Sequence, residues 1–196
     1  MNIDSTIRKR ILLGALATSA VAATVAVAPV SAGPETNPVS YPLAKREVQQ
    51  IRTATARFHD VETALAAGYV PTETCTAAPG LGGMGYHYAN PANIADGVID
   101  PTKPEILLYH LDDDGHLKLG GVEYFAPDAD QNLSTDADRP NLFGQPFDGP
   151  MPGHEPGMPV HYDLHVWLHT KNPAGLLAAW NPDVDCPTVP AEHHHD

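Results

Sequence analysis

The amino-acid sequence predicts a mainly β fold of the α+β class, an antiparallel β-barrel or β-sandwich with an N-terminal amphipathic helix packed on it. Two observations predict this fold. Residues 43–67 carry a helical pattern of apolar side chains. After Cys75, proline and glycine become frequent and the apolar runs shorten to the length of strands. A covering helix followed by many short strands is typical of a small β domain.

The first 32 residues have the three parts of a secretory signal peptide. A basic cluster at residues 8–10 precedes an apolar run from Ile11 to Val30, which closes on the small residues Ser31 and Ala32. A membrane anchor is the alternative, since about 20 residues suffice to cross a bilayer. The run is rich in Ala, Thr and Ser, and no cysteine at its end would take a lipid. We therefore expect cleavage after Ala32 and a secreted, extracytoplasmic protein.

Cleavage at that point leaves 164 of the 196 residues, the size of one ordinary domain. We expect a flexible N-terminus at 33–42, a single globular domain at 43–187 and a disordered, histidine-containing tail at 188–196. The signal carries three of the 11 basic and one of the 24 acidic side chains, so the formal charge of the remainder is −15. Such an acidic surface argues against nucleic-acid partners and, after cleavage, against membranes. A small-molecule ligand is one expected partner.

The chain has two cysteines, Cys75 and Cys186. In an oxidising compartment an even pair predicts one disulfide, which would tie the C-terminal end to the front of the domain. The chain-entropy model gives a loop of this length about 4–5 kcal/mol of stabilisation. A pair of thiolate metal ligands is the alternative.

The helical pattern runs from Leu43 to Ala67, with an apolar stripe that includes Ile51, Phe58 and Leu65. Gly68 predicts its end, because glycine is the usual residue just past a helix C-terminus. We expect the stripe to pack on the body of the domain.

Two strand-like runs follow, Ile106–Leu111 and Leu117–Leu119, around the turn residues Asp112–Gly115. This arrangement predicts a β-hairpin, and the acidic run is turn chemistry rather than a calcium loop. The return strand is expected to continue through Val122–Phe125, with Gly120-Gly121 as a bulge or a point of close approach.

The most informative segment runs from Val160 to His169. As a strand, it would present one apolar face and an opposite face with five side chains. The five are His161, Asp163, His165, Trp167 and His169. As a helix, it would place His161 and His165 one turn apart, where they could chelate zinc. The β-branched and aromatic residues favour the strand, in which these two histidines lie about 13 Å apart unless a bulge brings them together.

Two further residues have the character of metal ligands. His87 follows a glycine-rich approach and stands between two tyrosines, and Glu123 lies in an apolar run, where a buried carboxylate needs a partner or a metal. The predicted mononuclear site therefore comprises His87, Glu123, His161 and His165, holding a divalent transition metal, Zn, Cu, Fe or Mn. A polar core of hydrogen-bonded histidines is the structural alternative.

Other residues are expected near this site. The second group of candidate ligands is Asp163, His169, His154 and His110. The residues expected to line the pocket are Tyr86, Tyr88, Tyr124 and Trp167. The loop Phe143–Gly157 is expected to cover it, because long loops inside compact domains are commonly functional.

Nucleophilic catalysis has little support. Beyond the signal the only serines are Ser40 and Ser134, and the chain has no Gly-x-Ser-x-Gly, phosphate loop or dinucleotide-binding fingerprint. The predicted function is that of a secreted metal-binding protein with a mononuclear site. One form of this prediction is a metal-dependent enzyme that acts on a small organic substrate. The alternative is a non-enzymatic binding module for a small apolar ligand or a cell-surface partner.

Five motifs carry a resemblance: Gly83–Tyr88, Pro104–Tyr109, Gly121–Tyr124, Phe143–Phe147 and His161–Leu168. Through them the chain resembles a group of secreted, largely actinobacterial proteins of unknown function. The resemblance covers most of the domain and implies no activity. The chain is similar to cupins in ligand chemistry alone, because the cupin His-x-His spacing followed by Glu is absent.

Overall fold

The computed structural model describes residues 43–72, 75–154 and 157–187. The predicted signal peptide, flexible N-terminus and C-terminal tail lie outside these residues. The main element is a seven-stranded sheet in the order β1-β3-β4-β5-β9-β8, with β2 paired to β3 off this path, and every pairing is antiparallel. The sheet strands are β1 (Val70–Pro71), β2 (Thr76–Ala78), β3 (Gly82–Ala89), β4 (Ile106–Leu111), β5 (Leu117–Pro127), β8 (Asp148–Met151) and β9 (His161–Val166).

The prediction of a mainly antiparallel β domain is confirmed. A separate two-stranded sheet pairs β6 (Asn141–Leu142) with β7 (Gln145–Pro146). Within the described ranges, no ladder joins β1 to β8, so the strands form an open path and barrel closure is not shown.

The helical pattern of residues 43–67 forms three short elements instead of one helix. These are α1 (Lys45–Thr55), the 3-10 helix η1 (Ala56–His59) and α2 (Val61–Ala66). The run restarts at Asp60, whose extended backbone interrupts it and whose side chain accepts a hydrogen bond from Glu62 N at 3.1 Å. A fourth helix, α3 (Pro91–Asp96), follows β3. None of the described helices is long and apolar enough to cross a membrane.

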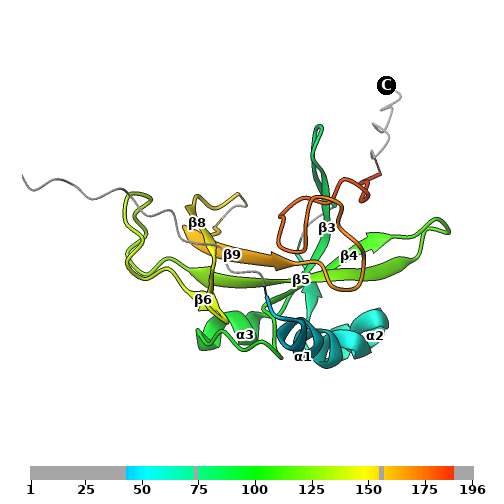
Figure 1. The fold of residues 1–196 in the computed structure, drawn as a ribbon, viewed down its shortest axis with the longest axis horizontal. Coiled ribbons are helices and arrows are strands. Elements are labelled where there is room, and N and C mark those ends of the chain that lie inside the picture. The colour runs from blue at the N-terminus through cyan, green and yellow to red at the C-terminus, as the bar shows by residue number, and fades with distance from the viewer. Residues whose placement is uncertain (1–42, 73–74, 155–156, 188–196) are drawn as a thin grey trace, which may run out of the picture. The chain divides into compact units, whose positions relative to one another are not determined.

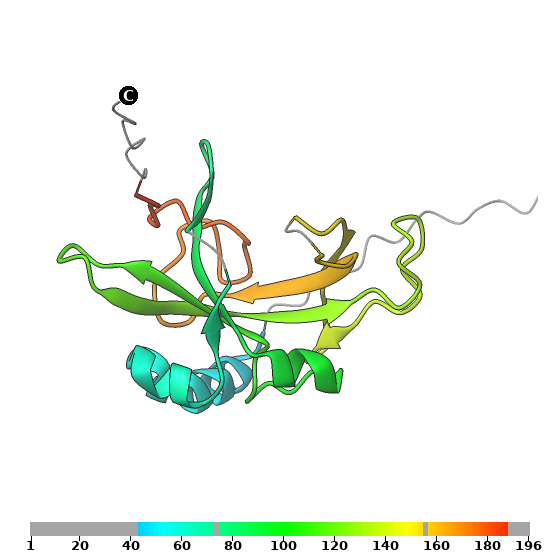
Figure 2. The same cartoon turned by 180° about the vertical axis from the view of Figure 1, so that it is seen from behind.

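The helices lie together on one face of the sheet (Figures 1 and 2). Ile51 of α1 and Phe58 of η1 belong to the same buried cluster as side chains from four strands of the main sheet. Leu65, the third residue named in the predicted stripe, is exposed instead. The strand members of this cluster include Tyr88, Leu107, Tyr109, Val122, Tyr124, Leu164 and Val166. The Tyr109 hydroxyl also donates a hydrogen bond to the Phe58 carbonyl at 2.6 Å, which ties η1 to β4.

The predicted hairpin is confirmed as β4 and β5. At its tip the Asp112 carboxylate accepts hydrogen bonds from the backbone N–H groups of Asp114 and His116, the turn chemistry expected there. The register shifts between Leu108 and Tyr109, which leaves Gly120 as the extra residue of a bulge. The close approach is also confirmed, because a Cβ on Gly121 would lie 2.7 Å from the Val166 carbonyl oxygen.

The C-terminal segment, residues 167–187, first contacts α1 through His169 and then crosses to the opposite face of the sheet, above the strands in Figure 1. The Trp167 indole N–H donates to the Ala178 carbonyl at 2.8 Å, and Asn181 exchanges two backbone hydrogen bonds with Gly83 of β3. The predicted disulfide is confirmed, since Cys75 and Cys186 are bonded with their Cα atoms 5.4 Å apart. This bridge fastens the end of the segment beside β2.

A buried carboxyl group makes the fold sensitive to pH. Glu105 is 1 % exposed and accepts a hydrogen bond from Phe125 N, and burial raises its pKa to about 8. Between its ordinary pKa of 4.5 and about 8, the unfolded chain is ionised at this position while the folded chain stays protonated. The contribution of Glu105 to the free energy of unfolding is therefore fully present below pH 4.5 and is lost as the pH rises to about 8.

Glu105→Gln is expected to remove this loss, because glutamine stays neutral in both states. Urea unfolding measures the free energy of unfolding of both proteins at pH 5 and pH 8.5. The value for the variant, relative to the wild type, should rise by a few kcal/mol between the two pH values. A variant with the same pH slope as the wild type would contradict this assignment.

Candidate metal centre

The segment from Val160 to His169 forms a strand over its first part, so the helical alternative is wrong. All six residues of β9 pair with β5 without a shift of register. His161, Asp163 and His165 therefore share one face, opposite the helices, as the alternation predicts. On the neighbouring strand Glu123 is the direct partner of His165.

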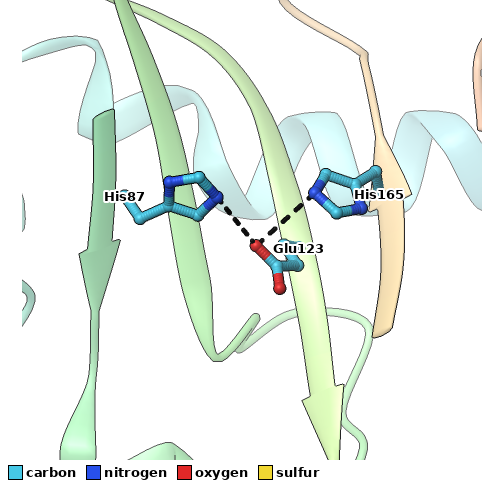
Figure 3. Close-up of side chains that lie close together, drawn as sticks. All are labelled: His87, Glu123 and His165. Atoms are coloured by element: carbon cyan, nitrogen blue, oxygen red, sulfur yellow. Dashed lines mark ion pairs between the residues drawn. The ribbon is translucent and has the colours of Figure 1, made fainter. Parts of the chain in front are cut away.

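Three strands bring three ligand side chains together. His87 comes from β3, Glu123 from β5 and His165 from β9, and Figure 3 shows them converging in front of the sheet with a helix behind it. His87 Nε2 lies 3.3 Å and His165 Nε2 lies 3.6 Å from the same atom, Glu123 Oε2. One ligand atom from each residue lies within 4.8 Å of the other two, and all three side chains are buried.

The spacing of these atoms is that of metal ligands. Hydrogen bonds between imidazolium and carboxylate groups are usually about 2.7–2.9 Å long, shorter than either contact. Nitrogen and oxygen ligands held 2.0–2.2 Å from a tetrahedral ion lie about 3.3–3.6 Å apart. Among the described residues, no group makes a hydrogen bond of normal geometry to Glu123 Oε2 or to either ring nitrogen of His165. Buried polar atoms without partners are costly, and an ion would satisfy them.

The charges of the centre favour a cation. Burial by itself raises the pKa of Glu123, but the neighbouring His165 and His87 imidazoles outweigh it and hold the pKa below its ordinary value. Burial lowers the pKa of His165, and the Glu123 and Asp163 carboxylates outweigh it and raise the pKa to about 9. The metal-free centre therefore pairs a carboxylate with a protonated imidazole, and an ion would take the place of that proton.

Asp163 supports the centre from the same strand. Its Oδ1 lies 3.7 Å from His165 Nδ1, the ring nitrogen that faces away from Glu123. A carboxylate beside the second nitrogen of a ligating histidine orients the ring and raises its basicity. Asp148 of β8 is the register partner of Asp163, and burial followed by the Asp163 charge raises its pKa. Two carboxylates therefore stand beside the three ligands.

The centre opens on a cavity of about 650 Å³. The three ligands form part of its wall. The other lining residues are Cys75, Thr76, Ala77, Met84, Asp148, Met151, His154, Asp163, Ala179 and Trp180. A metal ion held by these three ligands would have a coordination position open to the cavity, as in catalytic zinc sites.

The structure places the other predicted ligands apart from the three. His161 is buried on the same face of β9, but four residues from His165, and its Nδ1 donates to the Pro159 carbonyl at 3.1 Å. His154 lines the cavity. His110 Nε2 lies 2.8 Å from the Thr170 hydroxyl, and His169 Nε2 lies 2.9 Å from the Thr55 hydroxyl on α1.

The four aromatic residues expected in the pocket lie elsewhere, and none lines the cavity. Tyr88 and Tyr124 are part of the helix-facing core, and Tyr86 packs against it. The reason is the alternation of a strand, since side chains next to His87 or Glu123 point to the other face. Trp167 belongs to the second buried cluster and holds the C-terminal segment through its indole N–H.

The cavity walls include residues that the sequence did not indicate. Trp180 and Ala179 come from the C-terminal segment, and Thr76 and Ala77 come from β2. The disulfide joins these two regions, so the Cys75–Cys186 pair was the available signal. From the predicted covering loop Phe143–Gly157, the lining residues are Asp148, Met151 and His154.

No protein-family model matches the chain, and no match was found among curated proteins or among solved structures. The resemblance to secreted actinobacterial proteins therefore stays a prediction.

Proposed function

We propose that the protein binds one divalent transition-metal ion through His87, Glu123 and His165. The observation that carries this proposal is the spacing of three buried ligand atoms, two of them 3.3 and 3.6 Å from Glu123 Oε2. Two imidazoles and one carboxylate hold zinc in some hydrolases and iron(II) in many oxygenases. Zinc, iron, manganese and copper all accept this ligand set.

We further propose that the centre is that of an enzyme acting on a small organic substrate in the cavity. An ion at this position polarises a carbonyl group or lowers the pKa of a bound water. The Asp163 carboxylate lies 3.7 Å from His165 Nδ1 and supplies negative charge beside that ring, and Asp148 and Asp163 offer polar contacts to a substrate. Met84, Met151 and Trp180 supply the apolar wall that ligand pockets usually have.

The second candidate is a binding module without catalysis. The apolar part of the cavity favours it, since this wall suits a small apolar ligand whether or not an ion is bound. Turnover separates the two candidates, because a binding module retains its ligand unchanged.

The sequence of the first 32 residues and the disulfide together support export as part of the proposal. Disulfides persist in oxidising compartments, and Cys75–Cys186 is such a bond. N-terminal sequencing of protein from the culture medium is expected to begin near Gly33. Protein that keeps residues 1–32 and stays in the membrane would contradict export.

Metal analysis of untagged protein tests the ligand set. Wild-type protein is expected to hold one equivalent of zinc, iron or manganese after dialysis, and the double variant His87→Ala/His165→Ala is expected to hold none of these metals. His116→Ala is the matched control, because His116 belongs to an exposed Asp–His group at the hairpin tip that offers ligand atoms of the same kind. Zinc, iron or manganese that survives in the double variant, or that disappears in His116→Ala, would refute the proposed site.

A further inference from the structure

A second histidine on β9, His161, has the burial and hydrogen bonding typical of a metal ligand. His161 is fully buried, and its ring stacks on Phe125 with ring centroids 4.9 Å apart. Its Nδ1 lies 3.1 Å from the Pro159 carbonyl oxygen, and because a carbonyl only accepts, Nδ1 carries the proton. In the neutral ring Nε2 then carries a lone pair, and no described group donates a hydrogen bond to it. Ligating histidines usually donate their other N–H in this way.

Two methionines lie near the ends of the connection between β8 and β9. Met151 of β8 is the register partner of His161, and directly paired residues share one face of a sheet. Met158 lies near the other end of the connection between β8 and β9 and packs on the buried cluster that contains Phe125. The connection is tightly closed, because a Cβ on Gly153 would lie only 2.1 Å from the Met158 carbonyl oxygen. Glycine at this position allows the two ends of the connection to meet.

A second imidazole completes the group. The His154 ring lies 5.5 Å from the His161 ring at an interplanar angle of 66°. His154 and Met151 also line the same cavity. His154 and Met151 therefore lie beside His161 near one end of β9, and Met158 closes the connection that carries them. None of these four residues is a ligand in the His87, Glu123 and His165 centre.

We propose that Met151, His154, Met158 and His161 form a second metal site, which binds monovalent copper. Thioether sulfur is a soft ligand that selects Cu(I), and imidazole suits copper as well. The four residues include no carboxylate, so hard ions such as magnesium, calcium and manganese have little affinity for them. The site is independent of a metal at His87, Glu123 and His165, and its failure would leave that proposal standing.

Methionine also fills gaps in apolar cores without binding anything, and leucine replaces it there at little cost. Met151→Leu/Met158→Leu therefore removes both sulfur atoms while preserving volume and apolar contacts. The matched control is Met84→Leu, because Met84 lines the same cavity and is not part of the proposed site. All proteins should also carry His193→Ala, His194→Ala and His195→Ala, so that the tail contributes no copper ligands.

The experiment measures Cu(I) affinity by competition with bicinchoninate, under argon and with ascorbate present. With the His87, Glu123 and His165 centre saturated with zinc, the parent protein and Met84→Leu are expected to bind one equivalent equally tightly. Met151→Leu/Met158→Leu is expected to bind on the order of tenfold more weakly or worse, since it keeps only the imidazoles. Copper X-ray absorption should show sulfur neighbours in the parent protein and none in the leucine variant.

Circular dichroism of the leucine variant confirms that any loss is not one of folding, and zinc uptake at the other centre should be unchanged. Equal Cu(I) affinity in parent and leucine variant, or a copper shell of nitrogen and oxygen alone, would overturn the proposal. A parent protein that takes no copper from bicinchoninate would overturn it as well.

Discussion

Glu123→Gln is expected to abolish the stabilisation of the fold by divalent metal. In the wild type an ion that binds only the folded state raises the free energy of unfolding, by about 4 kcal/mol at a thousandfold excess over Kd. Glu123 Oε2 is the atom that both His87 and His165 face, and its charge is the only negative one among the three ligands. A glutamine amide has neither the charge nor the basicity to replace it. Thermal unfolding with and without added zinc measures the difference.

Asp163→Asn provides the graded comparison. It leaves all three ligands in place and removes only the charge 3.7 Å from His165 Nδ1. Such supporting carboxylates typically contribute about 10–100-fold in metal affinity, so this variant should still respond to zinc at higher concentration. A Glu123→Gln protein that is stabilised by zinc as strongly as the wild type would show that the ion binds elsewhere.

Cys75→Ala/Cys186→Ala is expected to lower the free energy of unfolding by about 2–5 kcal/mol. The bond closes a loop with a sequence separation of 111 residues, so its loss frees a large part of the unfolded chain. It also releases the C-terminal segment, whose Ala179 and Trp180 form part of the cavity wall. Guanidinium unfolding measures the first effect.

Hydrogen exchange measures the second effect, because the two ends of the domain should respond differently. Amides of the C-terminal segment, such as Trp167 and Asn181, are expected to lose protection, while those of α1 keep it. Wild-type protein treated with a reducing agent should reproduce the variant. An unchanged unfolding midpoint, or equal loss of protection in α1, would contradict a local role for the bridge.

Local patterns predicted much of the fold. The hairpin followed from two apolar runs around Asp112–Gly115, and the bulge followed from paired glycines in a strand. The break in the helical run was not predicted, because the apolar spacing continues through Asp60 and only its capping side chain marks a new start. The strand Val160–His169 was predicted too long, since β9 ends at Val166 and the chain then turns toward α1.

The same patterns predicted part of the candidate centre. Alternation along β9 correctly placed His161 and His165 on one face. The same alternation directs Tyr86 and Tyr88, on either side of His87, toward the helices and away from the predicted pocket. The grouping of His87 with Glu123 and His165 depends on the order of β3, β4, β5 and β9, a long-range property that short motifs do not encode. The cavity depends in addition on the segment that the disulfide holds in place.

The regular pairing of β5 with β9 has a consequence for errors in folding. A slip of one residue would turn His161, Asp163 and His165 into the apolar layer beneath the helices and turn Leu164 and Val166 outward. Several unsolvated polar groups in that layer would make the misaligned chain far less stable than the correct one. His161, Asp163 and His165 therefore also fix the register of β9 against β5, because only one alignment of the two strands keeps these side chains out of the apolar layer.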